Sequence, residues 1–242
     1  MSTIHFIGGE KGGIGKSVVS RLLSQYFLDH HERFAGFDAD QSHATLSRYY
    51  ADFVRPLNLD YFESTDAIME TALEADLQVL IDLPAQSQRF LDRWLDENSV
   101  LEMCAEMNIP LIYWYAVDDG PDSVQLLDKF LDKYAGMLNC VVVKNEGVGS
   151  DFSQLETMLG SRTGIHDDKL IQVHLPALHG PTMHKVNKLN FSFWAATHMK
   201  STAGPHLSLM ERQRSKVWLK KSYAVVDGVL NELIVAEEVT GG

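Results

Sequence analysis

Short apolar runs alternate with longer amphipathic runs along most of the chain. The first run, residues 3–7, is rich in β-branched and aromatic side chains and leads into glycines, as a buried strand does before a turn. Across residues 16–30, apolar side chains recur at steps of three and four residues, which is typical of an amphipathic helix. The chain therefore opens with a strand, a glycine-rich loop and a helix.

The same alternation continues to residue 175. The predicted strands are residues 34–37, 59–62, 77–81, 111–117, 138–144 and 170–175, and the predicted helices are 64–75, 88–107, 121–134 and 152–159. Such alternation favours an α/β fold with a doubly wound, mainly parallel sheet. After Pro176 the pattern is helical, with a break near Gly204 and a final amphipathic run at 218–234. We expect one domain over residues 1–242, with 177–242 as a mainly helical C-terminal extension.

Composition is that of a globular protein, because 45% of the 242 residues are hydrophobic and 22% are charged. The longest apolar stretch, residues 109–117, is much shorter than the roughly 18 residues of a membrane-spanning helix. The N-terminal residues lack the features of a secretory signal. The two cysteines, Cys104 and Cys140, are too few for a disulfide framework. We expect a cytoplasmic protein.

The strongest chemical signal is the loop between the first strand and the first helix, a P-loop variant. Its glycines allow backbone N–H groups to turn toward a phosphate, and the helix N-terminus adds positive potential. Lys16 can reach the outer phosphates, and the Ser17 hydroxyl can bind Mg²⁺. The ordinary P-loop pattern has a glycine where Glu10 stands. The residues expected to bind the nucleotide are Gly12, Gly13, Ile14, Gly15, Lys16 and Ser17.

The run from Lys11 to Ser17, Lys-Gly-Gly-Ile-Gly-Lys-Ser, resembles the deviant Walker A motif of the ParA/MinD family of ATPases. That resemblance implies ATP and Mg²⁺ as cofactors, and an ATP-dependent homodimer that encloses two nucleotides. It also implies that Lys11 and Lys16 are catalytic, with Lys11 reaching the partner's nucleotide as an arginine finger does. A solvated loop lysine is the alternative for Lys11.

Three carboxylates follow predicted strands, where parallel strands place polar groups beside a bound phosphate. Asp38 and Asp40 resemble the family's first switch, D-x-D-P-Q, although Gln41 stands where proline is usual. By that resemblance Asp38 lies in the Mg²⁺ shell and the catalytic Asp40 positions the attacking water, a helix cap being the alternative. Asp82, two residues before Pro84, resembles the Walker B motif and is expected to bind Mg²⁺. A simple turn at the strand end is its alternative.

Two further positions carry weaker sequence signals for contact with the base of the nucleotide. Asn145 ends a predicted strand where the family's adenine-contacting asparagine lies, and Pro176 begins a segment that resembles the later adenine loop. A turn asparagine and a strand-ending proline are the alternatives. The resemblance covers about residues 1–180, whereas the helical tail matches in character only.

Charge is segregated along the chain. The formal net charge is −12, yet residues 185–221 contain eight basic residues and one acidic residue. This segment could form a basic face for non-specific DNA or an acidic partner, or only the solvated surface of helices. Residues 231–242 are acidic, so we expect no membrane-binding helix there.

These features favour a Mg²⁺-dependent ATPase that dimerises with ATP, hydrolyses it slowly, and partitions or positions plasmid DNA or another cargo. A protein activator is a further expected partner. The irregular first switch and the helical tail also resemble the divergent ParA-like proteins encoded with plasmid stability and conjugation genes.

Two further hypotheses remain. One is an ATP-driven metallochaperone or a ligase on the same fold. A metallochaperone needs paired thiols near the dimer interface, whereas Cys104 and Cys140 fall in patterns typical of buried thiols. The other is a nucleotide-dependent interaction module with little hydrolysis, which the irregular first switch permits.

Overall fold

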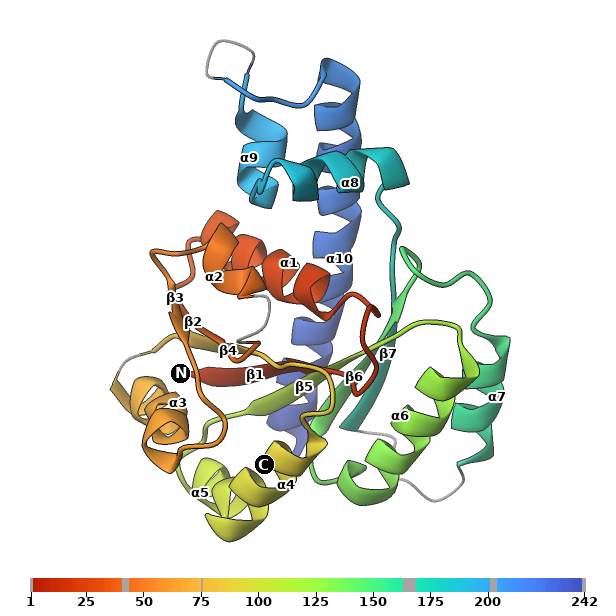
Figure 1. The fold of residues 1–242 in the computed structure, drawn as a ribbon. Coiled ribbons are helices and arrows are strands. Elements are labelled where there is room, and N and C mark those ends of the chain that lie inside the picture. The colour runs from red at the N-terminus through yellow and green to blue at the C-terminus, as the bar shows by residue number, and fades with distance from the viewer. Residues whose placement is uncertain (1, 41–43, 75, 163–168, 201–203, 241–242) are drawn as a thin grey trace.

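The computed structural model describes residues 2–40, 44–74, 76–162, 169–200 and 204–240, with side chains as far as Ile234. Seven strands form one sheet in the order β3-β2-β4-β1-β5-β6-β7, and each adjacent pair is parallel (Figure 1). The strands are β1 Thr3–Gly8, β2 Phe34–Asp38, β3 Val54–Pro56, β4 Gln78–Asp82, β5 Leu111–Val117, β6 Asn139–Asn145 and β7 Leu170–Leu175. The predicted doubly wound α/β fold is therefore confirmed.

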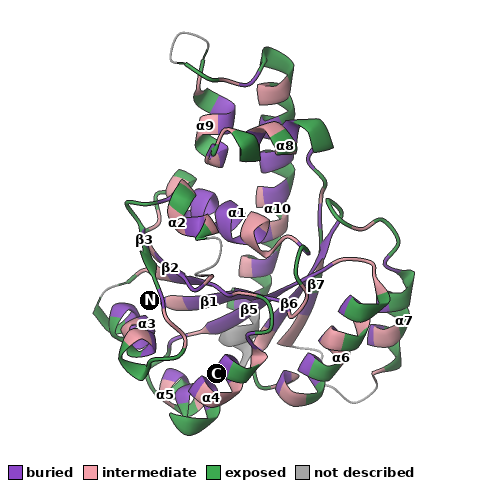
Figure 2. Cartoon of the chain, in the orientation of Figure 1, coloured by how far each residue is buried: buried purple, intermediate pink, exposed green. Residues whose placement is uncertain are grey.

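Helices cover both faces of the sheet, so the central strands are buried on both sides (Figure 2). All seven residues of β5 are buried, which explains its uninterrupted apolar sequence. One face packs against α3 Phe62–Glu74, α4 Gln88–Glu97, α5 Val100–Glu106, α6 Pro121–Tyr134 and α7 Ser153–Ser161. The other face packs against α1 Lys16–Asp29, α2 Thr45–Tyr49 and the C-terminal helices.

The C-terminal region is helical, as predicted. It contains α8 Gly180–Lys188, α9 Phe193–His198 and the 32-residue α10 Leu209–Thr240. Helix α10 runs from α8 and α9, which project beyond α1, down along the sheet (Figure 1). Its buried side chains, among them Trp218 and Val226, belong to the same core as α1. No helix among the described residues is both long and apolar enough to cross a membrane.

Two predicted elements are wrong. Residues 59–62 are not a strand, because Asp60 donates its N–H to the Asn58 side chain at 2.9 Å in a turn that leads into α3. The edge strand is instead β3, which pairs with β2. The helix predicted over 88–107 is broken by Ser99, whose φ of 46° cannot continue a right-handed helix. Helix α2, only five residues long, was not predicted.

Candidate nucleotide-binding site

The glycine-rich loop joins the end of β1 to the start of α1. Gly9, Gly13 and Gly15 have φ values of 136°, 79° and 93°, which residues other than glycine rarely adopt. At Gly15 an added Cβ would lie 2.0 Å from Asn145 Nδ2, so the backbone there rests directly on β6. At Gly12 and Gly13 an added Cβ would meet no described atom within 4 Å. The loop is thus fixed on one side and open on the other.

Lys16 is the first residue of α1, and its ammonium group turns back over the loop. Its Nζ donates hydrogen bonds to the carbonyl oxygens of Gly9 and Lys11, at 2.9 and 2.8 Å. Burial lowers the pKa of Lys16, whereas the nearby carboxylates of Asp82 and Glu10 oppose that shift. The ammonium charge therefore lies inside the loop, where a phosphate would neutralise it.

Asp38 and Asp82 lie side by side at the carboxyl ends of β2 and β4 and are 3% and 2% exposed. The two Asp38 oxygens accept the N–H groups of Asp40 and Ser47, at 3.2 and 2.9 Å. Asp82 Oδ1 accepts the Ser20 hydroxyl at 2.7 Å, but its buried Oδ2 has no hydrogen-bond partner among the described residues. Burial raises the pKa of Asp82 to about 7.

An unpartnered buried carboxylate oxygen is costly unless a cation or a proton reaches it. No group of three or more His, Cys, Asp or Glu side chains in the described residues could hold a metal ion by itself. Mg²⁺ does not need such a cage in nucleotide sites, because phosphates and water supply most of its ligands. Asp82 and the half-buried Ser17 therefore fit Mg²⁺ bound together with a phosphate.

Lys11 lies on the opposite side of the loop, and its Nζ is 2.7 Å from Asp118 Oδ2, just after β5. Asp118 also accepts the Ser123 hydroxyl and the Gly120 N–H. Burial alone would raise the pKa of Asp118, but these hydrogen bonds outweigh it and lower the pKa. The hydrogen bond to Asp118 raises the pKa of Lys11. The two charges thus hold each other in a fixed geometry.

No protein-family model matches the chain. Among curated proteins, it is 27% identical to Protein TraL of Escherichia coli over 90% of this chain and 94% of that protein. It is 23% identical to Protein MobD of Acidithiobacillus ferrooxidans over 95% and 99% of the two chains.

Among solved structures, this chain aligns with a Borrelia burgdorferi protein that is assigned to plasmid partition and is bound to AMPPNP. The TM-score is 0.54 and the identity 14%, over 91% and 99% of the chains. Pyrococcus horikoshii MinD with Mg-ADP gives a TM-score of 0.51 and 16% identity, over 99% and 96% of the chains. The chain has the ParA/MinD fold. The resemblance inferred from the loop is thereby confirmed at the level of the fold.

Within the ParA/MinD fold, the structure places Asn145 beneath the loop. Its Nδ2 donates to the Ile14 carbonyl at 2.9 Å and its Oδ1 accepts the Gly147 N–H at 3.0 Å. Pro176 follows β7, and its carbonyl accepts the Trp218 indole N–H at 2.7 Å beside a pocket of about 270 Å³. Asn145 therefore holds the loop in place, and the adenine contacts of Asn145 and Pro176 stay predictions.

The predicted first switch begins at Asp38 and includes Asp40, which is half-buried and whose carbonyl accepts the Ala44 N–H at 2.7 Å. Gln41 and the two residues after it lie outside the described residues. Helix α2 follows, and the Ser47 N–H bond to Asp38 links this helix to the carboxylate pair. The structure thus brings Asp38, Asp40 and Asp82 to one end of the sheet, while their roles toward Mg²⁺ and water stay predictions.

The basic segment 185–221 is only partly available for binding. Lys185 forms an ion pair with Glu211 at 2.8 Å, and Arg212 donates to the Leu207 carbonyl at 2.9 Å. The exposed basic side chains are those of Lys188, Lys200, Arg214, Lys216, Lys220 and Lys221. They leave a smaller basic surface, on α8, on α10 and at Lys200 just after α9, than the sequence count suggests.

The two thiols are buried, at 4% exposure for Cys104 and 2% for Cys140. Burial raises the pKa of Cys104 to about 11 and that of Cys140 to about 12. Both are therefore neutral thiols at neutral pH, whereas metal transfer requires thiolates. This burial argues against the metallochaperone hypothesis.

Two functional candidates were missed in the sequence. Asp118 directly follows an apolar strand, the same signal that pointed to Asp38 and Asp82. Glu10 accepts the Gln88 N–H at 3.0 Å and so caps α4, a contact across 78 residues that the sequence pattern does not indicate.

Proposed function

We propose that this protein is a Mg²⁺-dependent ATPase in which ATP binding closes a homodimer and slow hydrolysis reopens it. The observation that carries the proposal is the Lys16 ammonium group, which lies over the glycine-rich loop and interacts with the charge of Asp82 in the buried carboxylate pair of Asp38 and Asp82. One oxygen of that pair has no partner among the described residues. A loop with positive potential beside a buried carboxylate oxygen that lacks a partner can bind a triphosphate together with its metal ion.

Each residue then has one role in the reaction. The backbone N–H groups of Gly12 to Gly15 bind phosphate oxygens, and Lys16 neutralises the outer phosphates. Ser17, Asp38 and Asp82 would hold Mg²⁺, which draws negative charge from the phosphates when bound. Asp40 orients the attacking water. Lys11 leaves Asp118 and reaches the nucleotide of the partner subunit, where its charge stabilises the transition state.

We further propose that the switch positions plasmid DNA, held through the exposed lysines and arginines of α8 and α10, and that a protein activator speeds hydrolysis. Similarity to the Borrelia burgdorferi protein assigned to plasmid partition supports this choice of cargo. Contacts with phosphates of this kind are independent of base sequence and weaken as salt rises.

Calorimetry with Mg-ATP tests the nucleotide site directly. We expect binding by the wild type, and a loss of at least about tenfold in affinity in Lys16→Ala, because the ammonium–phosphate contact is removed. Lys129→Ala is the matched control, since Lys129 is exposed on α6. Absence of nucleotide binding by the wild type in the presence of Mg²⁺ refutes the proposal.

Light scattering after size exclusion tests the dimer. We expect ATP to produce a dimer of the wild type and not of Lys11→Ala, while both bind ATP with similar affinity. The ATPase rate, measured with and without DNA, completes the test. ATP binding without turnover or dimer formation would instead identify a nucleotide-dependent interaction module.

A further inference from the structure

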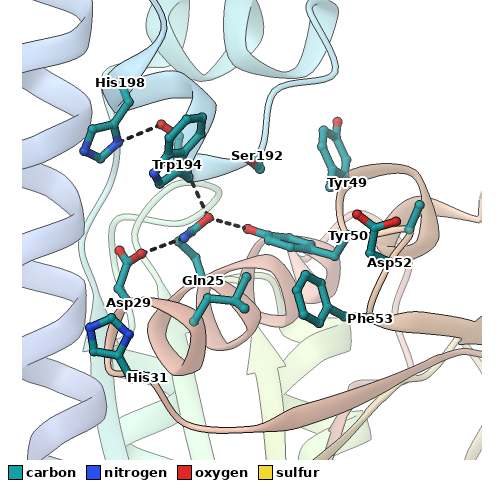
Figure 3. Close-up of a pocket in the computed structure, with 12 residues that line it drawn as sticks. Gln25, Asp29, His31, Tyr49, Tyr50, Asp52, Phe53, Ser192, Trp194 and His198 are labelled. Carbon is teal, nitrogen blue, oxygen red and sulfur yellow. Dashed lines mark hydrogen bonds between the residues drawn. The ribbon is translucent and has the colours of Figure 1, made fainter.

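A second pocket lies far from the nucleotide loop, at the other end of α1 (Figure 3). It has a volume of about 650 Å³ and opens between the end of α1, the turn from α2 to β3, and α9. The lining residues of α1 begin at Gln25, nine residues after Lys16, so about 14 Å of helix separate the near side of this pocket from Lys16. The pocket is therefore distinct from the candidate nucleotide site.

Aromatic faces line much of this pocket. Trp194 is 52% exposed and Phe53 is 44% exposed, whereas the other three tryptophans of the chain are at most 4% exposed. The Trp194 ring stacks on His198 with a centroid distance of 5.0 Å and an interplanar angle of 19°. A large exposed aromatic surface held rigid in this way is a typical feature of a recognition site.

Two carboxylates border the same pocket, and among the residues that the structure describes no lysine or arginine lines it. Asp29 is fixed by the Gln25 amide and the Tyr223 hydroxyl, both at 2.8 Å. Asp52 is exposed and makes no hydrogen bond or ion pair with the part of the chain that is described. The other titratable side chains that line the pocket are His31, His198, Tyr49 and Tyr50. Asp29 and Asp52 therefore bring two carboxylates to the pocket wall, while the buried guanidinium group of Arg21 lies on the Tyr49 ring.

We propose that this pocket binds the guanidinium or ammonium group of a basic peptide segment on a partner protein. One cation of the peptide would lie on the face of Trp194 on the Asp29 side of the pocket, and a second would pair with Asp52, a combination of cation–π and charge-assisted contacts. Nucleic acid fits less well, because the same two carboxylates repel phosphate groups. The pocket volume lies within the usual range for a ligand site, roughly 300–1,000 Å³.

The pocket is also connected to the carboxylate pair of the nucleotide site. Gln25 Oε1 accepts hydrogen bonds from the backbone N–H of Trp194 at 2.9 Å and from the Tyr50 hydroxyl at 3.2 Å. These two bonds join α9 to the end of α2. The middle residue of α2, Ser47, bonds to Asp38 through its N–H. If the proposed ATPase function is correct, an occupant that shifts α2 changes the position of Asp38. The binding itself does not depend on that function.

Tryptophan fluorescence tests the proposal on the full-length protein without nucleotide. The probe is a tetra-arginine peptide with blocked termini at about 0.15 M salt, with tetraglutamate as the opposite-charge probe. We expect a saturable change in emission with tetra-arginine alone, because Trp194 is the exposed indole. Calorimetry should show affinity about fivefold weaker in Asp52→Asn and in Trp194→Ala. Asp66→Asn, an exposed change of the same charge on α3, should bind as the wild type does.

Both test residues are exposed, so their variants should keep the wild-type melting temperature, which circular dichroism checks. Equal affinity in the wild type, Asp52→Asn and Trp194→Ala overturns the proposal. Equal weakening by Asp66→Asn also overturns it, because the effect is then one of net charge. A single-stranded oligonucleotide that displaces the peptide and quenches Trp194 would show a nucleic-acid site instead.

Discussion

Lys11 and Asp118 form an ion pair within one protomer, with 2.7 Å between Nζ and Oδ2. An added Cβ at Gly120 would lie 2.9 Å from Lys11 Nζ, so a side chain there would require the lysine end to shift. In this arrangement Lys11 is directed toward the end of its own β5. If Lys11 acts on the partner's nucleotide as proposed, it must first break this contact, and Asp118 would then compete with dimerisation.

Replacing Asp118 by asparagine should therefore promote the ATP-dependent dimer. The ion pair is partly exposed, at 30% and 18%, so its contribution is about 1 kcal/mol or less, and we expect a several-fold lower dimer dissociation constant. Analytical ultracentrifugation with a non-hydrolysable ATP analogue gives this constant. Asp122→Asn is the matched control, because Asp122 is exposed nearby without a hydrogen bond to Lys11. A weaker dimer in Asp118→Asn would show that Asp118 assists closure instead.

The raised pKa of Asp82 leads us to expect that the free energy of unfolding depends on pH. Its folded pKa of about 7 is above its ordinary value of 3.8, so the folded state holds the proton more tightly than the unfolded chain does. The stability from this group is complete below about pH 4 and is lost as the pH rises toward 7. Asp82→Asn, which is neutral at every pH, should raise the melting temperature of the nucleotide-free protein by several degrees at pH 8 and by clearly less at pH 5.

Differential scanning calorimetry across this pH range measures the effect, and Asp66→Asn serves as the surface control. The nucleotide site adds a second expectation. Mg²⁺ with ADP should stabilise the wild type more than Asp82→Asn, because asparagine cannot offer a charged ligand. A stabilising effect of Asp82→Asn that is the same at pH 5 and pH 8 would contradict the burial argument.

The central strands could be predicted because parallel strands buried on both faces appear as continuous apolar runs. The edge of the sheet could not. Strand β3 has three residues, of which only Val54 is buried, and α2 is too short to show a helical period. The break at Ser99 depends on a positive φ at a residue other than glycine, for which the sequence carries no signal.

The glycine-rich loop between β1 and α1 could be predicted because its residues lie in one contiguous segment, from Gly8 to Ser17, whereas phosphate binding by it stays a prediction. The contacts that support it depend on the fold. Lys11 and Asp118 are 107 residues apart, and Ile14 and Asn145 are 131 apart. Such pairs become neighbours only through the strand order, which places β5 and then β6 after β1 in the sheet.

Arg21 should be essential for the attachment of α8 and α9 to α1. It is 2% exposed and donates to Asn187 Oδ1 at 2.8 Å and to the Phe191 carbonyl at 3.0 Å. Its guanidinium group lies between two rings, 3.8 Å from the centroid of Tyr49 and 4.6 Å from that of Phe193. The lysine ammonium group is not planar and cannot make the same pair of hydrogen bonds and ring contacts. Arg21→Lys should therefore lower the free energy of unfolding by about 2–4 kcal/mol.

Urea unfolding followed by circular dichroism measures this loss, and Trp194 fluorescence shows whether α9 detaches first. The control is Arg89→Lys, because Arg89 lies at the edge of α4 on the opposite face of the sheet. An Arg21→Lys variant as stable as the wild type would show that the aromatic contacts need only a positive charge.

Glu10 should determine how firmly the phosphate loop is attached to α4. Its carboxylate accepts the Gln88 N–H at 3.0 Å, and its carbonyl accepts the Gln86 N–H at 3.2 Å. Burial raises the pKa of Glu10, and the hydrogen bond from the Gln88 N–H partly offsets that rise. Glu10→Ala should speed hydrogen exchange at the Gln88 amide about fivefold, since a lost cap costs about 1 kcal/mol. Glu10→Gln keeps an acceptor oxygen and should exchange as the wild type does; equal exchange in all three proteins would show that α4 is held without the loop.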